Sequence, residues 1–286
     1  MNPLRNIRVG MIAYASALLT LSVAACSVQP RILIEGLDVP MGIAVCDRNI
    51  FVAEAGDRRV GVYDSDGRFV YGIDGFERPF DVACSHDSIF VADFGTDRVF
   101  RLRRDAKVRK VSEAHLLPLP FAGPAAVTVF NEQLYVTEFY GHRVQKVDLV
   151  TYQKQVYGHK GSEPGAMYYP TDTKIFSDGR LVVADAYNHR VQIFDADGSH
   201  RFTFTREDYG FNVPASVAVN ADLALVVADS ANHRVVKIGK DRAKEILWQT
   251  DATDIHSPAR ISLDHDGLYI VDPSGGQILI IENPDL

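Results

Sequence analysis

The chain has 286 residues, and 47% of them are apolar, which is enough for a large hydrophobic core. Its formal charge is −7, and it contains no long basic run. Proteins that bind nucleic acid need clustered Lys and Arg to contact phosphates, so we expect no nucleic-acid partner.

The first 25 residues are predicted to be an export signal. Arg5 and Arg8 are followed by a mostly apolar stretch of 15 residues, Val9–Val23. That length is typical of a signal peptide and short for a membrane-spanning helix, which needs about 20 residues. The formal charge falls to −9 when these two arginines leave with the leader.

The end of this leader, Val23-Ala24-Ala25-Cys26, resembles the lipobox of bacterial lipoproteins. The resemblance implies a lipoprotein signal peptide at 1–25, a lipidated Cys26 and a short tether at 26–30, with the folded chain at 31–286. Ser27 resembles the pattern for sorting to the outer membrane. We therefore expect a protein of the bacterial cell envelope that is lipid-anchored, faces the periplasm and touches the membrane through its anchor alone. An ordinary signal that ends by chance at a Cys is the alternative.

From about residue 31 onward, one pattern recurs six times. An acidic residue is followed five positions later by Arg and then by an aliphatic residue, except in the last copy, which has Gln277. The acidic residues are Glu54, Asp93, Glu138, Asp185, Asp229 and Asp272, and a proline precedes each by 14 or 15 positions. Such a period with β-type segments is typical of propeller blades. The sequence predicts an all-β fold, a six-bladed β-propeller with four-stranded antiparallel blades.

Within each repeat, the proline opens a run of small apolar residues that suits an innermost strand. A strongly β-forming run, the Arg-containing strand and an outer strand follow. The last repeat lacks its outer strand, and Arg31–Ile34 resembles the outer strand at 68–71. We predict that this N-terminal strand completes the last blade and closes the ring.

Two repeats carry a more specific motif: Val-Ala-Asp-Ala-Tyr-Asn-His-Arg-Val at 183–191 and Val-Ala-Asp-Ser-Ala-Asn-His-Arg-Val at 227–235. These motifs resemble the NHL family of six-bladed propellers, and the resemblance extends over 31–286. It implies the fold and leaves the activity open, because NHL-like propellers include peptide-amidating lyases, RNA binders, receptor ectodomains and scaffolds.

Two recurring features are predicted to be structural. The acid–Arg pair occurs in almost every repeat, whereas a functional site is usually singular, so we interpret it as a brace for the loop between the second and third strands. His142, His189 and His233 share one repeat position, immediately before Arg. That position lies out on each blade, and zinc ligands must converge on one ion, so we predict no metal site there.

The residues two positions after each proline should surround the axial channel. They are Gly42, Asp81, Ala126, Asp172, Ser216 and Arg260. Asp81, Asp172 and Arg260 are the candidate catalytic group, and Ca or Zn at this mouth is one alternative. No complete set of metal ligands is recovered, so we favour a solvated channel whose charges partly neutralise one another, with no metal or cofactor.

Aromatic residues gather in the loops at one face of blades two to four. They are Phe80, Phe94, Phe121, Phe139, Tyr140, Tyr168, Tyr169 and Tyr187. Clustered exposed aromatics often form an interface, but the same rings could pack between adjacent blades. Cys46 and Cys84 lie on neighbouring inner strands, and the sequence leaves open whether they are bonded.

Two functions follow from these features. The first is a membrane-tethered envelope lipoprotein whose NHL-like propeller is a binding or scaffold module for a protein, peptide or glycan. The second is a hydrolase or lyase, lactonase-like or peptide-amidating-lyase-like, with its site at the axial mouth. The absence of a complete catalytic set favours the binding module over an enzyme.

Overall fold

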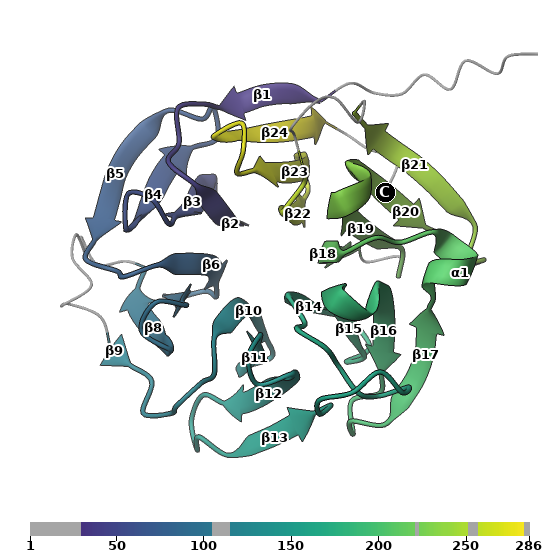
Figure 1. Cartoon of the computed structure of the whole chain (residues 1–286). Coiled ribbons are helices and arrows are strands. Elements are labelled where there is room, and N and C mark those ends of the chain that lie inside the picture. The colour runs from purple at the N-terminus through teal and green to yellow at the C-terminus, as the bar shows by residue number, and fades with distance from the viewer. Residues whose placement is uncertain (1–29, 105–114, 221–222, 251–256, 283–286) are drawn as a thin grey trace, which may run out of the picture.

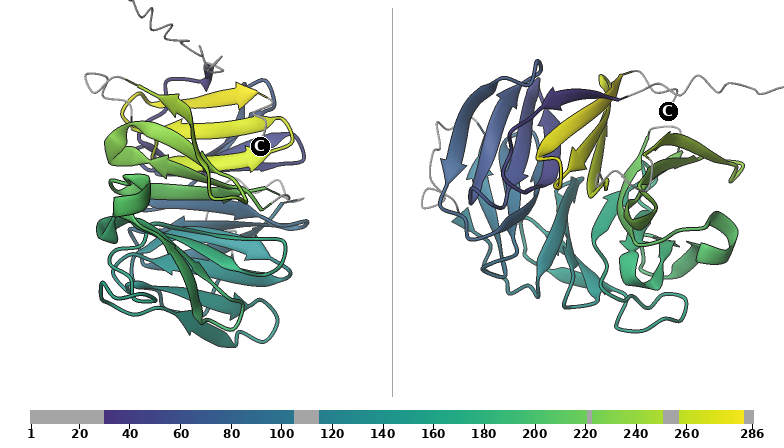
Figure 2. Two further views of the ribbon diagram at one scale, coloured as in Figure 1. Left: turned by 90° about the vertical axis from the view of Figure 1, so that its right-hand side faces the viewer. Right: turned by 45° about the horizontal axis from the view of Figure 1, so that its top comes forward.

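The computed structural model describes residues 30–104, 115–220, 223–250 and 257–282. Six four-stranded antiparallel sheets form a ring around a central axis (Figure 1). Seen from the side, the molecule has the shape of a thick disc (Figure 2). The prediction of a six-bladed β-propeller is confirmed. Each blade begins with its strand nearest the axis and continues outward strand by strand.

The blades are numbered along the chain. Blade 1 comprises β2 (Pro40–Cys46), β3 (Asn49–Glu54), β4 (Arg59–Asp64) and β5 (Phe69–Asp74). Blade 2 comprises β6 (Pro79–Cys84), β7 (Ser88–Asp93), β8 (Arg98–Arg103) and β9 (His115–Leu116). Blade 3 comprises β10 (Pro124–Phe130), β11 (Gln133–Glu138), β12 (Arg143–Asp148) and β13 (Lys154–Tyr157).

The second half of the ring repeats this order. Blade 4 comprises β14 (Asp172–Ile175), β15 (Leu181–Asp185), β16 (Arg190–Phe194) and β17 (His200–Phe204). Blade 5 comprises β18 (Pro214–Val219), β19 (Leu225–Asp229), β20 (Arg234–Ile238) and β21 (Lys244–Gln249). Blade 6 comprises β22 (Arg260–Asp264), β23 (Gly267–Asp272), β24 (Gln277–Glu282) and, from the other end of the chain, β1 (Arg31–Ile34).

Strand β1 closes the ring as predicted. It pairs antiparallel with β24, with Arg31 opposite Ile280 and Ile32 opposite Leu279, and Figure 1 shows the purple strand beside the yellow one. Ile34 is buried in a cluster that also contains Ile50 of blade 1. The two ends of the described chain therefore share one blade, and their pairing closes the ring of blades.

The hydrophobic core lies between the blades. Phe51 and Ile73 of blade 1, for example, pack in one cluster with Val82 and Ile89 of blade 2. The second strand of each blade is covered on both faces by neighbouring sheets, and every residue of β7 is buried. This double burial explains why the second strands are continuous apolar runs and do not alternate with polar residues.

The recurring acidic residue braces each blade from a buried position. Asp185 accepts a hydrogen bond from the Tyr168 backbone N–H and pairs with Arg190 at 2.7 Å. Asp229 is held in the same way by the Asn212 N–H and by Arg234 at 2.7 Å. Equivalent ion pairs join Glu54 to Arg59 and Glu138 to Arg143, and Asp272 accepts a hydrogen bond from Gln277.

Blade 2 departs from this pattern, because Asp93 forms no ion pair with Arg98. Its carboxylate accepts hydrogen bonds from the backbone N–H groups of Glu77, Arg78 and Gly95, and a further one from the Thr96 hydroxyl. The carboxylate is therefore satisfied locally, and Arg98 stays exposed.

The three repeated histidines lie apart and tie successive blades together. His142 Nδ1 accepts a hydrogen bond from the Tyr169 N–H, and His189 Nδ1 accepts one from the Val213 N–H, each at 3.0 Å. His233 Nδ1 lies 3.0 Å from the Ser257 hydroxyl. Each histidine thus contacts the residue before the proline of the next blade, which is a structural role.

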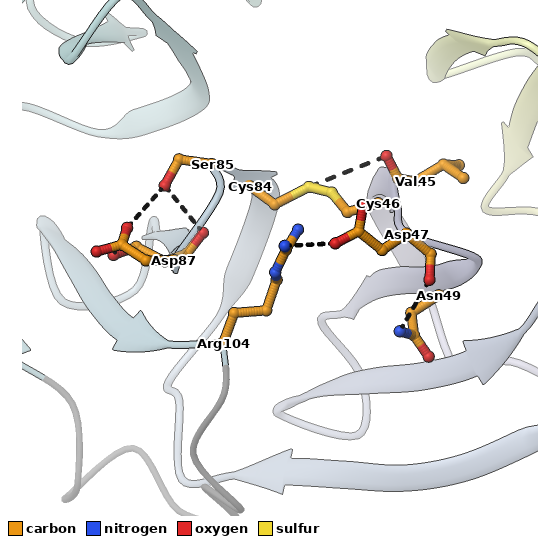
Figure 3. The surroundings of a disulfide bond; sticks show 9 residues. Val45, Cys46, Asp47, Asn49, Cys84, Ser85, Asp87 and Arg104 are labelled. Carbon is orange, nitrogen blue, oxygen red and sulfur yellow. Dashed lines mark hydrogen bonds and ion pairs between the residues drawn. A yellow bond between two sulfur atoms is a disulfide. The ribbon is translucent and has the colours of Figure 1, made fainter.

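Cys46 and Cys84 form a disulfide between the inner strands of blades 1 and 2, with their Cα atoms 6.6 Å apart (Figure 3). That separation is within the range that a disulfide spans. Ion pairing between Arg104 and Asp47 links the same two blades beside it.

In the part of the chain that the structure describes, the one α-helix is the four-residue segment α1 (Arg206–Tyr209). Across the described residues, no helix combines the length and apolar character needed to cross a bilayer. The predicted signal peptide, Cys26 and most of the tether lie outside the described residues.

Candidate functional site

The antiparallel blades give the disc two different faces. The loops between second and third strands, and the segments entering each inner strand, share one face, which we call the loop face. The turns between first and second strands, and between third and fourth strands, share the other, which we call the hairpin face. Each inner strand runs from the loop face to the hairpin face, so its first residues lie near the former (Figure 2).

The structure brings the three predicted axial residues together. Arg260 extends from blade 6 across the axis, where its Nη1 lies 3.0 Å from Asp172 Oδ1 and its Nε lies 3.6 Å from Asp81 Oδ1. Its guanidinium also donates to the carbonyl oxygens of Ala125 and Thr171. One side chain thus connects blades 2, 3, 4 and 6 and blocks the axis.

These charges are buried, contrary to the solvated channel that we expected. The side chain of Asp172 is fully buried, and those of Asp81 and Arg260 are 2% and 7% exposed. Burial raises the pKa of Asp81 above its usual range. Burial acts on Asp172 in the same direction, but the Lys174 ammonium and the Arg260 guanidinium outweigh it and hold the pKa of Asp172 low.

The axial carboxylates do not fit a calcium or zinc site. Asp172 Oδ1 already accepts from Lys174 and the Thr173 N–H, and its Oδ2 accepts from the Ser216 hydroxyl and the Val217 N–H. Asp81 Oδ2 accepts from the Val127 N–H. Calcium takes six to eight oxygen ligands, and a guanidinium occupies the place between these two carboxylates. Within the described residues, the only group of three potential ligands close enough for one ion is the surface turn Asp264–Asp266.

Most of the predicted aromatic residues form one continuous surface on the loop face. We call it the aromatic shelf, and it consists of Phe80, Phe94, Phe139, Tyr140, Tyr168, Tyr169 and Tyr187. Ring contacts of 4.4–6.4 Å between centroids connect all seven side chains across blades 2, 3 and 4. Phe121 is the exception to the prediction, because it is buried in the core between blades 2 and 3.

The centre of the shelf has two exposed walls above a floor. Tyr140 and Tyr187 are 59% and 51% exposed. Both stand at 81° to the ring of Phe139, which lies between them and contacts Tyr169 at 4.6 Å. Tyr140 and Tyr187 each pack against the two rings of the floor, Phe139 and Tyr169. No ring contact joins Tyr140 directly to Tyr187. The arrangement offers flat apolar surfaces in two nearly perpendicular orientations.

Several residues that the sequence analysis did not single out shape this shelf. A Cβ at Gly123 would lie 2.7 Å from the Tyr140 ring and 3.1 Å from the Phe94 ring, so the missing side chain makes room for both. Arg78 lies over Phe80 at 4.8 Å, and Lys160 lies 5.9 Å from the Tyr168 ring. Cation–π contacts therefore flank the shelf at both ends. The signal available in the sequence was a glycine immediately before a repeat proline. In the structure this residue, Gly123, has a left-handed backbone with a φ of 62°.

Solved structures with similar folds include enzymes and a structural genomics protein of unknown function from Bacteroides thetaiotaomicron. A gluconolactonase from Xanthomonas campestris superposes with a TM-score of 0.70 over 88% of this chain and 89% of its own, at 16% identity. A streptogramin B lyase gives 0.64 over 84% and 78%, at 16% identity. A catalytically inactive virginiamycin B lyase from Staphylococcus aureus, with quinupristin, gives 0.65 over 88% and 97%, at 14% identity. At such identities the likeness establishes the fold alone.

The family comparison agrees with the sequence motifs. The NHL repeat model matches residues 167–194 and 211–238. Each matched segment runs from the entry of an inner strand to the third strand, in blades 4 and 5. The chain therefore carries NHL repeats and is a six-bladed β-propeller.

Proposed function

We propose that this protein is a binding or scaffold module of the bacterial cell envelope and that the aromatic shelf is its binding surface. The observation that carries the proposal is the exposure of Tyr140 and Tyr187 on a continuous array of rings. Exposed aromatic clusters of this kind are enriched at interfaces and supply much of their binding energy. A catalytic centre would need accessible groups, whereas the axial carboxylates are buried and paired.

The geometry of the shelf indicates the chemistry of the partner. Perpendicular tyrosine walls above a floor of Phe139 and Tyr169 suit flat apolar groups, such as prolyl and aromatic side chains of a peptide or protein, or the sugar rings of a glycan. The phenolic hydroxyls add hydrogen-bonding capacity at the edge of the surface.

The test compares binding by the original protein and two variants of the whole chain, each immobilised and exposed to extracts of the cell envelope. Tyr140→Ala combined with Tyr187→Ala removes both walls and leaves the buried core intact. We expect captured partners to bind roughly 30-fold more weakly, which corresponds to the loss of about 2 kcal/mol at a hot spot. Tyr152→Ala is the control, because Tyr152 is a similarly exposed tyrosine on the hairpin face. Equal capture by the original protein and both variants would refute the proposal.

The envelope location rests on the leader and on Cys26. Lipid attachment at this residue would hold the propeller close to a membrane, since 26–30 spans under about 20 Å when fully extended. We expect Cys26→Ser to move the protein from the membrane fraction to the soluble fraction. Mass analysis of the N-terminal peptide would show no lipid if the alternative, an ordinary cleaved signal, is correct.

A hydrolase or lyase is the second candidate, and the fold likeness to a gluconolactonase, a streptogramin B lyase and a virginiamycin B lyase favours it. In this alternative Asp81, Asp172 and Arg260 would act at the axial mouth. It predicts turnover of lactones or of precursors of amidated peptides, abolished by Asp172→Asn. The absence of turnover with and without added calcium or zinc would leave the binding module as the single candidate.

A further inference from the structure

A second layer of side chains lines the axis below the Arg260 cluster. These residues lie four positions after each proline, on the same side of the inner strand as the residues of the cluster. They are Ala44, Ala83, Thr128, Lys174, Ala218 and Ser262. Five of the six are small, so the channel widens here into a cavity of about 300 Å³.

The residues that line this axial cavity are mostly apolar or small, with one charged side chain among them. Its lining includes apolar residues that are only partly buried, such as Val129, Val219 and Leu263. Among the described residues that line it, Lys174 is the single charged one, and no carboxylate is present. The cavity therefore combines one cation with apolar walls in a protein whose net charge is negative.

Lys174 has capacity left for a ligand. Its Nζ lies 2.8 Å from Asp172 Oδ1, and this is its one hydrogen bond to a described residue. An ammonium group has three donors, so two remain, and the side chain is 23% exposed. Asp172 in turn keeps Arg260, the Ser216 hydroxyl and two backbone N–H groups as partners, so it does not depend on Lys174 alone.

We infer that the axial cavity is a binding site, separate from the aromatic shelf, for a small monocarboxylate with a short aliphatic chain. The carboxylate would accept hydrogen bonds from Lys174, and the chain would contact the aliphatic walls. One partly neutralised cation suits a single negative charge better than a phosphate or a dicarboxylate. At roughly 30 Å³ per water-sized group, the volume holds about ten such groups, which suits an acid of this size.

The probe is pentanoate, titrated into the whole purified protein and followed by NMR chemical shifts. Pentanol and pentylammonium have the same chain without the negative charge. We expect pentanoate to bind at least about tenfold more tightly than either, because a charge-assisted hydrogen bond replaces a neutral or repulsive contact. Equal affinity for the three compounds would contradict the inference.

Three variants locate the site. Lys174→Met removes the charge at similar length, and Ser262→Leu fills the cavity without touching the charged cluster. Both should weaken pentanoate binding at least about tenfold, and if Lys174→Met fails to fold, Ser262→Leu decides alone. Lys154→Met, on the outer strand β13, is the control and should bind as the original protein does. Unchanged binding by Ser262→Leu would overturn the assignment, whatever the result for the aromatic shelf.

Discussion

Single residues on the loop face decide whether the aromatic rings can meet. Gly123 has a φ of 62° and lies beneath Tyr140 and Phe94, so it combines a backbone conformation that favours glycine with a close approach of two rings. Gly36 has a similar φ of 75°, but nothing lies within 4 Å of its added Cβ. Substitutions at these two glycines therefore distinguish the cost of backbone strain, present at both, from the cost of displacing neighbouring rings, present at Gly123 alone.

Gly123→Ala should cost more than Gly36→Ala. Each substitution places an alanine in the left-handed region, at a cost of roughly 1–2 kcal/mol. Only the first also pushes the Tyr140 and Phe94 rings away, so we expect a larger loss of unfolding free energy and a changed near-ultraviolet circular dichroism spectrum. Denaturant unfolding of both variants measures the difference, and equal losses would contradict the described packing.

The two axial aspartates should respond to pH in opposite directions. The low pKa of Asp172 means that its contribution to stability is present above the pKa of an unfolded Asp, about 4, and is lost as the pH falls through the lower folded value. The raised pKa of Asp81 means that its contribution is present below about pH 4 and is lost as the pH rises through the folded value.

The corresponding amide variants test this contrast. Asp172→Asn should destabilise the protein by about 3–5 kcal/mol near neutral pH, since it breaks a buried ion pair, and by less in acid. Asp81→Asn should show its largest cost in acid and a smaller one near neutral pH. The measurement is the free energy of unfolding of each variant and of the original protein at about pH 3 and about pH 7. Parallel pH profiles for the two variants would show that the cluster is not organised as described.

Among the structural elements, strand β1 is the one that closes the ring. Its four residues join the first part of the chain to the last blade, and their exposure falls from Arg31 and Ile32, which are exposed, to Ile34, which is buried. Ile34 is 4% exposed and packs between blades 6 and 1, whereas Ile32 is 52% exposed on the same strand. This pair is a matched test of ring closure.

Ile34→Ala should lower the free energy of unfolding by about 2–4 kcal/mol, because it leaves a cavity where two blades meet. Ile32→Ala should change it by less than about 0.5 kcal/mol. Denaturant titration of both variants gives the comparison. Similar small effects for both would mean that β1 does not close the ring.

The disulfide links two further elements, β2 and β6, across 38 positions of sequence. Replacing Cys46 and Cys84 by Ser should destabilise the protein by about 2–4 kcal/mol, since the unfolded chain gains freedom. A reducing agent should cause the same loss in the original protein and none in the double variant. Insensitivity of the original protein to reduction would show that the two thiols are free in solution.

At these two scales the sequence predicted the elements better than the contacts. The period of the repeat was sufficient to predict six blades. The missing outer strand of the last repeat was sufficient to predict that Arg31–Ile34 closes the ring. The burial of the acidic brace and of the axial charges could not be predicted, because it depends on how closely the blades approach one another. Phe121 shows the same limit of prediction. It lies in the same group of loops as the exposed rings, but its side chain is buried in the core.

At the scale of the whole molecule, the two proposed binding sites lie on different faces. The loop face carries the aromatic shelf, with Tyr140 and Tyr187 as its exposed walls. The hairpin face carries the opening of the axial cavity and the disulfide at its rim, where Cys84 is one of the lining residues. Arg260 and its carboxylate partners separate the two, because they block the axis between the faces. Binding at one face therefore does not require access from the other.

The most direct test of the central claim, that the aromatic shelf is the binding surface, is photo-crosslinking in living cells. A photoreactive phenylalanine analogue placed at position 187 reports contacts of the shelf, and the same analogue at position 152 reports contacts of the hairpin face. We predict a discrete crosslinked partner from position 187 that disappears when Tyr140→Ala is added, and no such partner from position 152. Identical crosslinks from both positions, or none from position 187, would contradict the account.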